Sequence, residues 1–77
     1  MTLAISAQLD LKGLSCPLPI VKTAKAMKGR ASGDLIEVLA TDPGSVKDFA
    51  AWARATGNEL LESSQLGNVF RFVIRKR

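Results

Sequence analysis

Polar and apolar residues follow two different periods along this chain. Alternation at every second position, or a short dense apolar run, predicts four strands, at residues 8–12, 34–40, 59–64 and 69–75. Apolar residues at helical spacing predict two helices, at residues 17–28 and between Ser45 and Gly57. The predicted order of elements is therefore βαβαββ, with a hairpin turn at Gly67-Asn68 before the last strand.

The same pattern predicts which side chains form the core. In the strands, the inward-facing residues are expected to be Leu9, Leu11, Ile36, Val38, Ala40, Phe70, Phe72 and Ile74. In the helices, the buried stripes are expected to comprise Ile20, Val21, Ala24, Met27, Val46, Phe49, Ala50 and Ala53, with Trp52 at the margin. Glu37 is expected to point to water. Leu35, Leu39 and Val73 are expected on the opposite face of the sheet, which would hint at a partner or a homodimer.

Turn and capping residues mark the ends of the second helix. Ser45 follows the turn at residues 41–44 and is expected to cap the helix, with Asp48 as a weak capping-box partner. Gly57 suits the left-handed position that ends a helix. We therefore expect one domain over residues 1–77, with residues 1–7 as a loose extension. Its predicted class is α+β: a two-layer sandwich with both helices on one face of a four-stranded mixed sheet.

Charge and cysteine content limit the possible functions. The net charge of +4 favours acidic partners, which could be proteins or RNA. One cysteine and no histidine exclude an internal disulfide and a Cys–His catalytic pair within the chain, and we expect no metal site. A free thiol suggests a reducing compartment. We find neither a signal peptide nor a membrane-spanning run and therefore expect a cytoplasmic protein.

The strongest chemical signal is Cys16, which has prolines at the first and third positions after it. Proline suits the first turn of a helix, so this pattern predicts Cys16 as the N-cap of the first helix. A helix N-terminus is electropositive and favours the thiolate, the nucleophile of sulfur chemistry. Leu18 is expected to supply the main nearby N–H group. The alternative is that Cys16 is a small, buried and inert hydrophobic residue.

Two groups of basic residues have two interpretations each. Lys22, Lys25 and Lys28 form either a solvated helix face or a basic ridge that meets an acidic partner. The basic residues of the C-terminal segment form either a solubilising strand edge or a docking patch: Arg71, Arg75, Lys76 and Arg77. Asp10 and Gly13 are expected to close the first strand into the turn that presents Cys16.

Residues 9–19 (LDLKGLSCPLP) resemble the signature of the TusA/SirA family of small sulfurtransferases. Residues 42–45, 57–60 and 70–76 resemble the same family, so the likeness extends from about Leu9 to Lys76. The resemblance implies a βαβαββ sandwich in which Cys16 carries sulfane sulfur as a persulfide and needs no other cofactor. The motif residues that would shape this site are Gly13, Pro17, Leu18 and Pro19.

The resemblance also implies partners. The donor would be a cysteine desulfurase or a rhodanese-like protein, and the acceptor a protein of the DsrE/TusD type. The downstream uses would be tRNA thiolation, sulfur oxidation or cofactor sulfuration. Candidate docking residues are Lys22, Lys25 and Arg75. Leu18 stands where the enterobacterial tRNA-thiolation member has an acidic residue, which bears on the choice of partner.

Two other function classes remain open from the residues alone. A nucleic-acid-binding module would use the positive charge, but Phe70 and Phe72 are expected to face inward and are poor stacking platforms. A regulatory module would use Cys16 to sense redox state by joining two chains reversibly.

Overall fold

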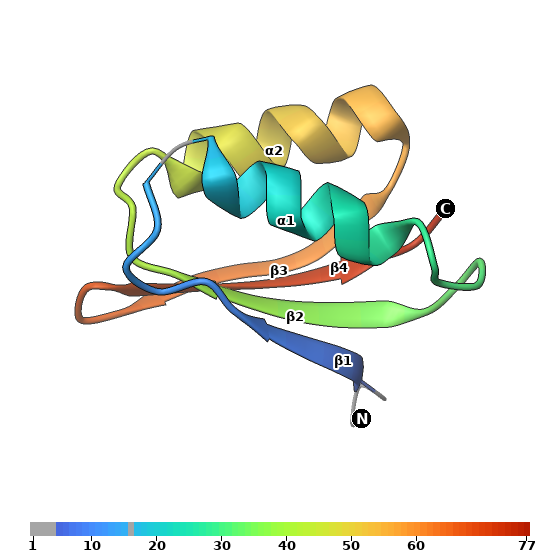
Figure 1. The fold of residues 1–77 in the computed structure, drawn as a ribbon, viewed down its shortest axis with the longest axis horizontal. Coiled ribbons are helices and arrows are strands. Elements are labelled where there is room, and N and C mark those ends of the chain that lie inside the picture. Colours follow the sequence, from blue (N-terminus) through green and yellow to red (C-terminus); the bar gives the residue numbers. More distant parts are fainter. Residues whose placement is uncertain (1–4, 16) are drawn as a thin grey trace.

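Six elements follow one another in the predicted order (Figure 1). The structure is a computed structural model, and it describes residues 5–15 and 17–77. The elements are β1 (Ile5–Asp10), α1 (Leu18–Met27), β2 (Leu35–Ala40), α2 (Ser45–Thr56), β3 (Glu59–Leu66) and β4 (Val69–Arg75). Both helices lie on one face of the sheet, so the predicted α+β sandwich is confirmed.

The four strands form a mixed sheet in the order β1-β2-β4-β3. β1 runs parallel to β2, whereas β4 is antiparallel to both β2 and β3. The connection through α2 places β3 two positions away from β2 in the sheet, and β4 then lies between them. β4 is therefore an inner strand. The prediction that Arg71 and Arg75 guard a sheet edge was wrong, because β1 and β3 form the edges.

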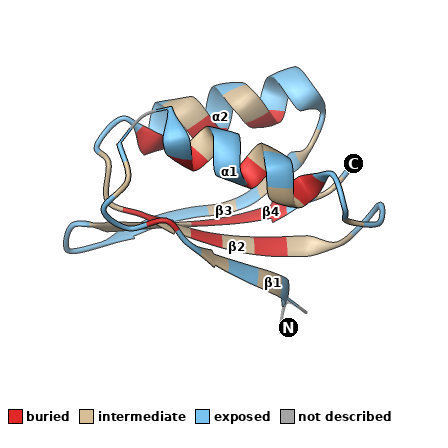
Figure 2. Cartoon of the chain, viewed as in Figure 1, coloured by how far each residue is buried: buried red, intermediate tan, exposed pale blue. Residues whose placement is uncertain are grey.

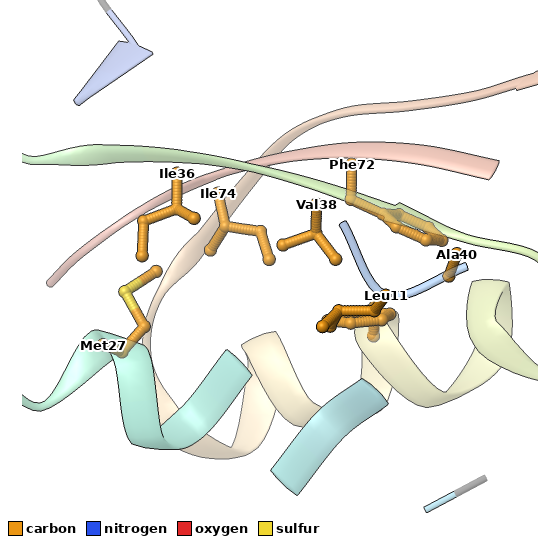
Figure 3. Packing of buried hydrophobic residues seen from close by; sticks show 8 residues of the cluster. Leu11, Met27, Ile36, Val38, Ala40, Phe72 and Ile74 are labelled. Carbon is orange, nitrogen blue, oxygen red and sulfur yellow. The ribbon is translucent and has the colours of Figure 1, made fainter. Parts of the chain in front are cut away.

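The core lies between the sheet and the two helices, as Figures 2 and 3 show. Ile36, Val38, Phe72 and Ile74 point from the sheet toward the helices and are fully buried. The other buried members of this cluster are Leu11, Met27, Ala40 and Phe49, with Leu9, Leu14, Ile20, Trp52, Leu60 and Phe70 packed around them. All the predicted inward-facing strand residues thus belong to this core or pack against it.

The buried stripes of the helices are narrower than predicted. Val21 is 52% exposed, Val46 is 41% exposed, and Ala50 is also exposed. The residues buried on α1 are Pro19, Thr23 and Met27, and those on α2 are Ser45, Phe49 and Ala53. Each set repeats every fourth residue, because each helix touches the sheet along a single i, i+4 row. Val21, Val46 and Ala50 lie to the side of that row.

Several boundaries differ from the predicted ones. β1 begins at Ile5 and ends at Asp10, so residues 5–7 belong to the sheet, and residues 1–4 lie outside the described ranges. Helix α2 has Gly44 at its N-cap and no side-chain cap. The Ser45 N–H donates to the Asp42 carbonyl oxygen at 3.0 Å, which closes the turn one residue early. Ser45 therefore enters the helix as its first residue. Gly57 ends α2 with φ of 77°, as predicted.

Cross-strand ion pairs cover the opposite face of the sheet. Arg71 Nε lies 2.5 Å from Glu37 Oε2, and Arg71 Nη1 lies 2.8 Å from Glu62 Oε1. A bulge at Leu61 shifts the register of β3, which places Glu62 opposite Val73 on this face. Glu37 also accepts a hydrogen bond from Gln8. Glu37 was predicted to point to water, and it does lie on the face away from the helices, where it is paired and mostly covered.

These contacts shift the pKa values of Glu37 and Arg71 and make that face of the sheet less apolar. The hydrogen bond from Arg71, followed by that from Gln8, lowers the pKa of Glu37, and the Glu37 partner raises the pKa of Arg71. Val73 is fully buried, and Leu35 and Leu39 are half-buried. The predicted apolar residues do lie on this face, but paired charges run among them, so it is not a bare apolar patch.

Candidate functional site

Two hydrogen bonds tie the chain before Cys16 to the end of β2 and the residue after it, and a third closes the turn on itself. The Leu11 N–H donates to the Leu39 carbonyl oxygen at 2.8 Å, and the Lys12 N–H donates to Asp10 Oδ1 at 3.2 Å. Gly13 adopts φ of +84°, in the region that favours glycine, and its N–H donates to Thr41 Oγ1 at 2.9 Å. Asp10 and Gly13 thus hold the turn that leads to the motif.

Thr41 is a residue that the sequence analysis missed. It directly follows β2, and its hydroxyl oxygen anchors the turn across the end of the sheet. Nothing in its local sequence distinguishes it from any other turn threonine, because its partner is 28 positions away. Only the parallel pairing of β1 with β2 brings the two segments together.

The start of α1 corrects two predictions. The N-cap residue is Pro17, with φ of −97° and ψ of 13°, one residue later than predicted. Its carbonyl oxygen accepts the first helical hydrogen bond, from the Val21 N–H at 3.1 Å. The Leu18 N–H donates to the Ser15 carbonyl oxygen at 2.9 Å, so it is not the free donor that was expected. This hydrogen bond from Leu18 back to Ser15 therefore precedes the first helical one.

Cys16 itself lies outside the described residues, so its exposure and its contacts stay predictions. Its two chain neighbours, Ser15 and Pro17, are exposed, and Leu18 is 44% exposed. Pro19 is the second residue of α1 and is buried. The first turn of α1 contains no acidic side chain, which leaves the positive end of the helix dipole uncompensated there.

The three candidate docking residues do not share one surface. Lys22 and Lys25 are exposed on α1. Arg75 lies on β4 and pairs with Glu59 of β3. The register puts Arg75 on the same face as Arg71 and Val73, which is the face opposite the helices. A partner that touches the two lysines therefore cannot reach Arg75 without wrapping around the sheet.

Within residues 5–15 and 17–77, no three side chains of the His, Cys, Asp or Glu type come together to hold a metal ion. In the same part of the chain, no helix has the length and apolar character needed to cross a bilayer.

The fold is a small α+β sandwich, and the single cysteine of the sequence directly precedes, along the chain, the N-cap residue of the first helix. A family described as Sulfurtransferase TusA matches residues 7–76. The chain is 54% identical to the sulfur carrier protein TusA of Allochromatium vinosum over 90% of this chain and 91% of that one. It is 34% identical to the sulfur carrier protein TusA of Pseudomonas aeruginosa over 100% and 98%. The chain belongs to the TusA/SirA family of sulfur carrier proteins.

A solved structure shows the same fold. The crystal structure of a SirA-like protein from Desulfitobacterium hafniense superposes with a TM-score of 0.78 over 90% of this chain and 95% of that one. The two sequences are 22% identical. The βαβαββ sandwich is thus shared between chains that differ at most positions.

Proposed function

We propose that Cys16 accepts sulfane sulfur as a persulfide and passes it to a thiol of an acceptor protein. The observation that carries this proposal is the chain's membership of the sulfur carrier family, combined with the presence of a single cysteine in the whole sequence. The exposure of Ser15 and Pro17 supports it, because a relay thiol has to meet thiols of other proteins.

The chemistry consists of two thiol exchanges. In the first, the Cys16 thiolate attacks the outer sulfur of a donor persulfide, the donor's S–S bond breaks, and the donor cysteine leaves as a thiolate. In the second, an acceptor thiolate attacks the outer sulfur on Cys16, and Cys16 is released as a thiolate. Neither step consumes an external oxidant or reductant. Because the chain has no second cysteine, no thiol of the same chain can attack the persulfide before an acceptor does.

The proposed donor is a cysteine desulfurase or a rhodanese-like protein, and the proposed acceptor is of the DsrE/TusD type. The sulfur would serve tRNA thiolation, sulfur oxidation or cofactor sulfuration. We further propose that partners meet Lys22 and Lys25, which lie on the helix that Cys16 precedes. A reducing, cytoplasmic setting would keep the thiol free for each cycle.

A label-transfer experiment tests the proposal. The protein is loaded with radiolabelled cysteine and a cysteine desulfurase, separated from the donor, and mixed with a DsrE/TusD-type acceptor. We expect the label to move to the acceptor and to be released by a thiol reductant, and we expect Cys16→Ser to acquire no label. If oxidation joins two chains through Cys16 while several donors and acceptors exchange no sulfur, the redox-sensing alternative replaces this proposal.

A further inference from the structure

We infer that the groove between α1 and α2 is the docking site for an acidic, partly apolar segment of a partner protein. Two adjoining hollows form this groove, and they share Ala24, Lys28 and Trp52. The hollow nearer the start of α1 has a volume of about 390 Å³ and extends to Ile20, Val21 and Lys25. The other extends to the C-terminal residues Lys76 and Arg77. We call the whole surface the α1–α2 groove.

The charge of the groove selects an acidic occupant. Its lining contains the four cations Lys25, Lys28, Lys76 and Arg77 and no acidic side chain. Throughout the described part of the chain, the ion pairs involve Lys12, Arg71 and Arg75 and none of these four. Because an acidic segment would pair with all four cations, the charge of the groove favours such a partner and steers its approach.

Hydrogen bonds fix the main chain at two of these four residues, Lys76 and Arg77. The Lys76 N–H donates to the Asp34 carbonyl oxygen, and the Gly33 N–H donates to the Lys76 carbonyl oxygen, each at 2.8 Å. The Arg77 N–H donates to Asn58 Oδ1 at 2.9 Å. The end of the chain is therefore fixed against the loop before β2 and the residue after Gly57. A partner would not have to order the main chain of residues 76–77 in order to bind here.

The apolar part of the groove selects a protein segment over a nucleic acid. Ala24 and Trp52 line both hollows, and the exposed Val21 and Leu18 continue the apolar surface toward the start of α1. Trp52 is half-buried and packs against Phe49 with ring centroids 6.2 Å apart. It is therefore held by the core and is not a free platform on which a base could stack. An apolar side chain flanked by carboxylates fits both parts of the groove.

The position of the groove also relates it to the proposed sulfur transfer, and this step of the inference rests on that proposed function. The strip formed by Leu18 and Val21 leads from the groove to the residues that follow Cys16. A partner seated in the groove would therefore have its adjoining surface close to the sulfur-carrying segment. Lys25 belongs to the groove lining, whereas Lys22 does not. The two lysines that the sequence treats alike should thus contribute differently to docking.

Fluorescence of the single tryptophan tests the inference directly, because Trp52 lines both hollows. The probe is a synthetic peptide of about twelve residues in which leucines at helical spacing are flanked by glutamates. We expect saturable binding that changes the Trp52 emission. A peptide of the same length with lysine in place of glutamate, and one with serine in place of leucine, should not bind.

Charge-reversal variants locate the peptide. We expect Lys25→Glu with Lys28→Glu to weaken its binding by about tenfold or more. The matched control is Lys47→Glu with Arg54→Glu, which makes the same change in net charge on exposed residues of α2 outside the groove lining. The control should bind within about twofold of the original chain. Equal loss in both pairs, no binding at all, or tighter binding of an oligouridine at the groove would each overturn the inference.

The outcome is separable from that of the sulfur relay. Peptide binding is measured on the Cys16→Ser variant, which needs no sulfur chemistry, and sulfur loading is measured without peptide. A protein that takes up sulfur but ignores the peptide contradicts the groove inference alone. A protein that binds the peptide in the groove but takes up no sulfur from several donors contradicts the relay alone.

Discussion

The substitution Gly13→Ala tests how the turn that leads to Cys16 contributes to function, apart from the rest of the fold. Gly13 has φ of +84°, and a Cβ added there would meet no atom within 4 Å. The substitution therefore adds backbone strain and no clash. Left-handed backbone costs an ordinary residue about 1–2 kcal/mol, which lowers Tm by roughly 5–15 °C in a domain of this size. Relief of that strain would pull the Gly13 N–H away from Thr41 Oγ1 and displace the following turn.

The chain offers a matched control at the β3–β4 turn. Gly67 has φ of +62° and equally open surroundings, so Gly67→Ala should lower Tm by a similar amount. Thermal unfolding by circular dichroism measures both losses, and the label-transfer assay measures function. We expect Gly13→Ala to slow sulfur transfer several-fold more than Gly67→Ala. Equal transfer rates for the two variants, or a Gly13→Ala protein as stable as the original, would refute the reasoning.

Two further predictions concern stability. Glu37→Gln should lower the free energy of unfolding by about 1–2 kcal/mol near neutral pH, because it removes the charge that Arg71 binds. Folding lowers the pKa of Glu37, so this contribution is full above its unfolded pKa and is lost as the pH falls through its folded pKa. Urea titrations along a pH series should show the two proteins converging in acid, whereas the more exposed Glu59→Gln should change stability by less than about 0.5 kcal/mol throughout. Ser45→Ala should leave the free energy of unfolding unchanged or raise it, because the buried Ser45 Oγ has no hydrogen-bond partner in the described structure. A loss of about 1 kcal/mol in urea denaturation would contradict this and would support the capping role predicted for Ser45.

The order of elements and the inward faces of β1, β2 and β4 could be predicted because they depend on local period. No inward face was predicted for β3, where a bulge at Leu61 breaks the alternation. β4 pairs with β2 without a register shift, so the prediction that Phe72 and Ile74 face the helices and Val73 faces away follows from neighbouring residues alone. The helices were less predictable. Val46 is as apolar as a core residue, and only the docking angle of α2 on the sheet decides that Ser45 is buried in its place.

The candidate site shows the same difference between features set by local sequence and features set by the packing of distant segments. Gly13 and the two prolines that follow Cys16 could be identified from the sequence, because glycine and proline indicate local backbone geometry. Thr41, the ion pairs of Arg71 and the α1–α2 groove could not be identified in this way. Each of these depends on segments that the fold brings together from distant positions: β1 with β2, β2 with β4, and α1 with α2 and the C-terminal residues.

The intact mass of the protein after incubation with a cysteine desulfurase and cysteine tests the persulfide most directly. The account predicts a gain of one sulfur atom, removed by a thiol reductant and absent from a Cys16→Ser protein that unfolds at the same temperature. An unchanged mass with several sulfur donors, or an equal gain in the Cys16→Ser protein, would contradict it.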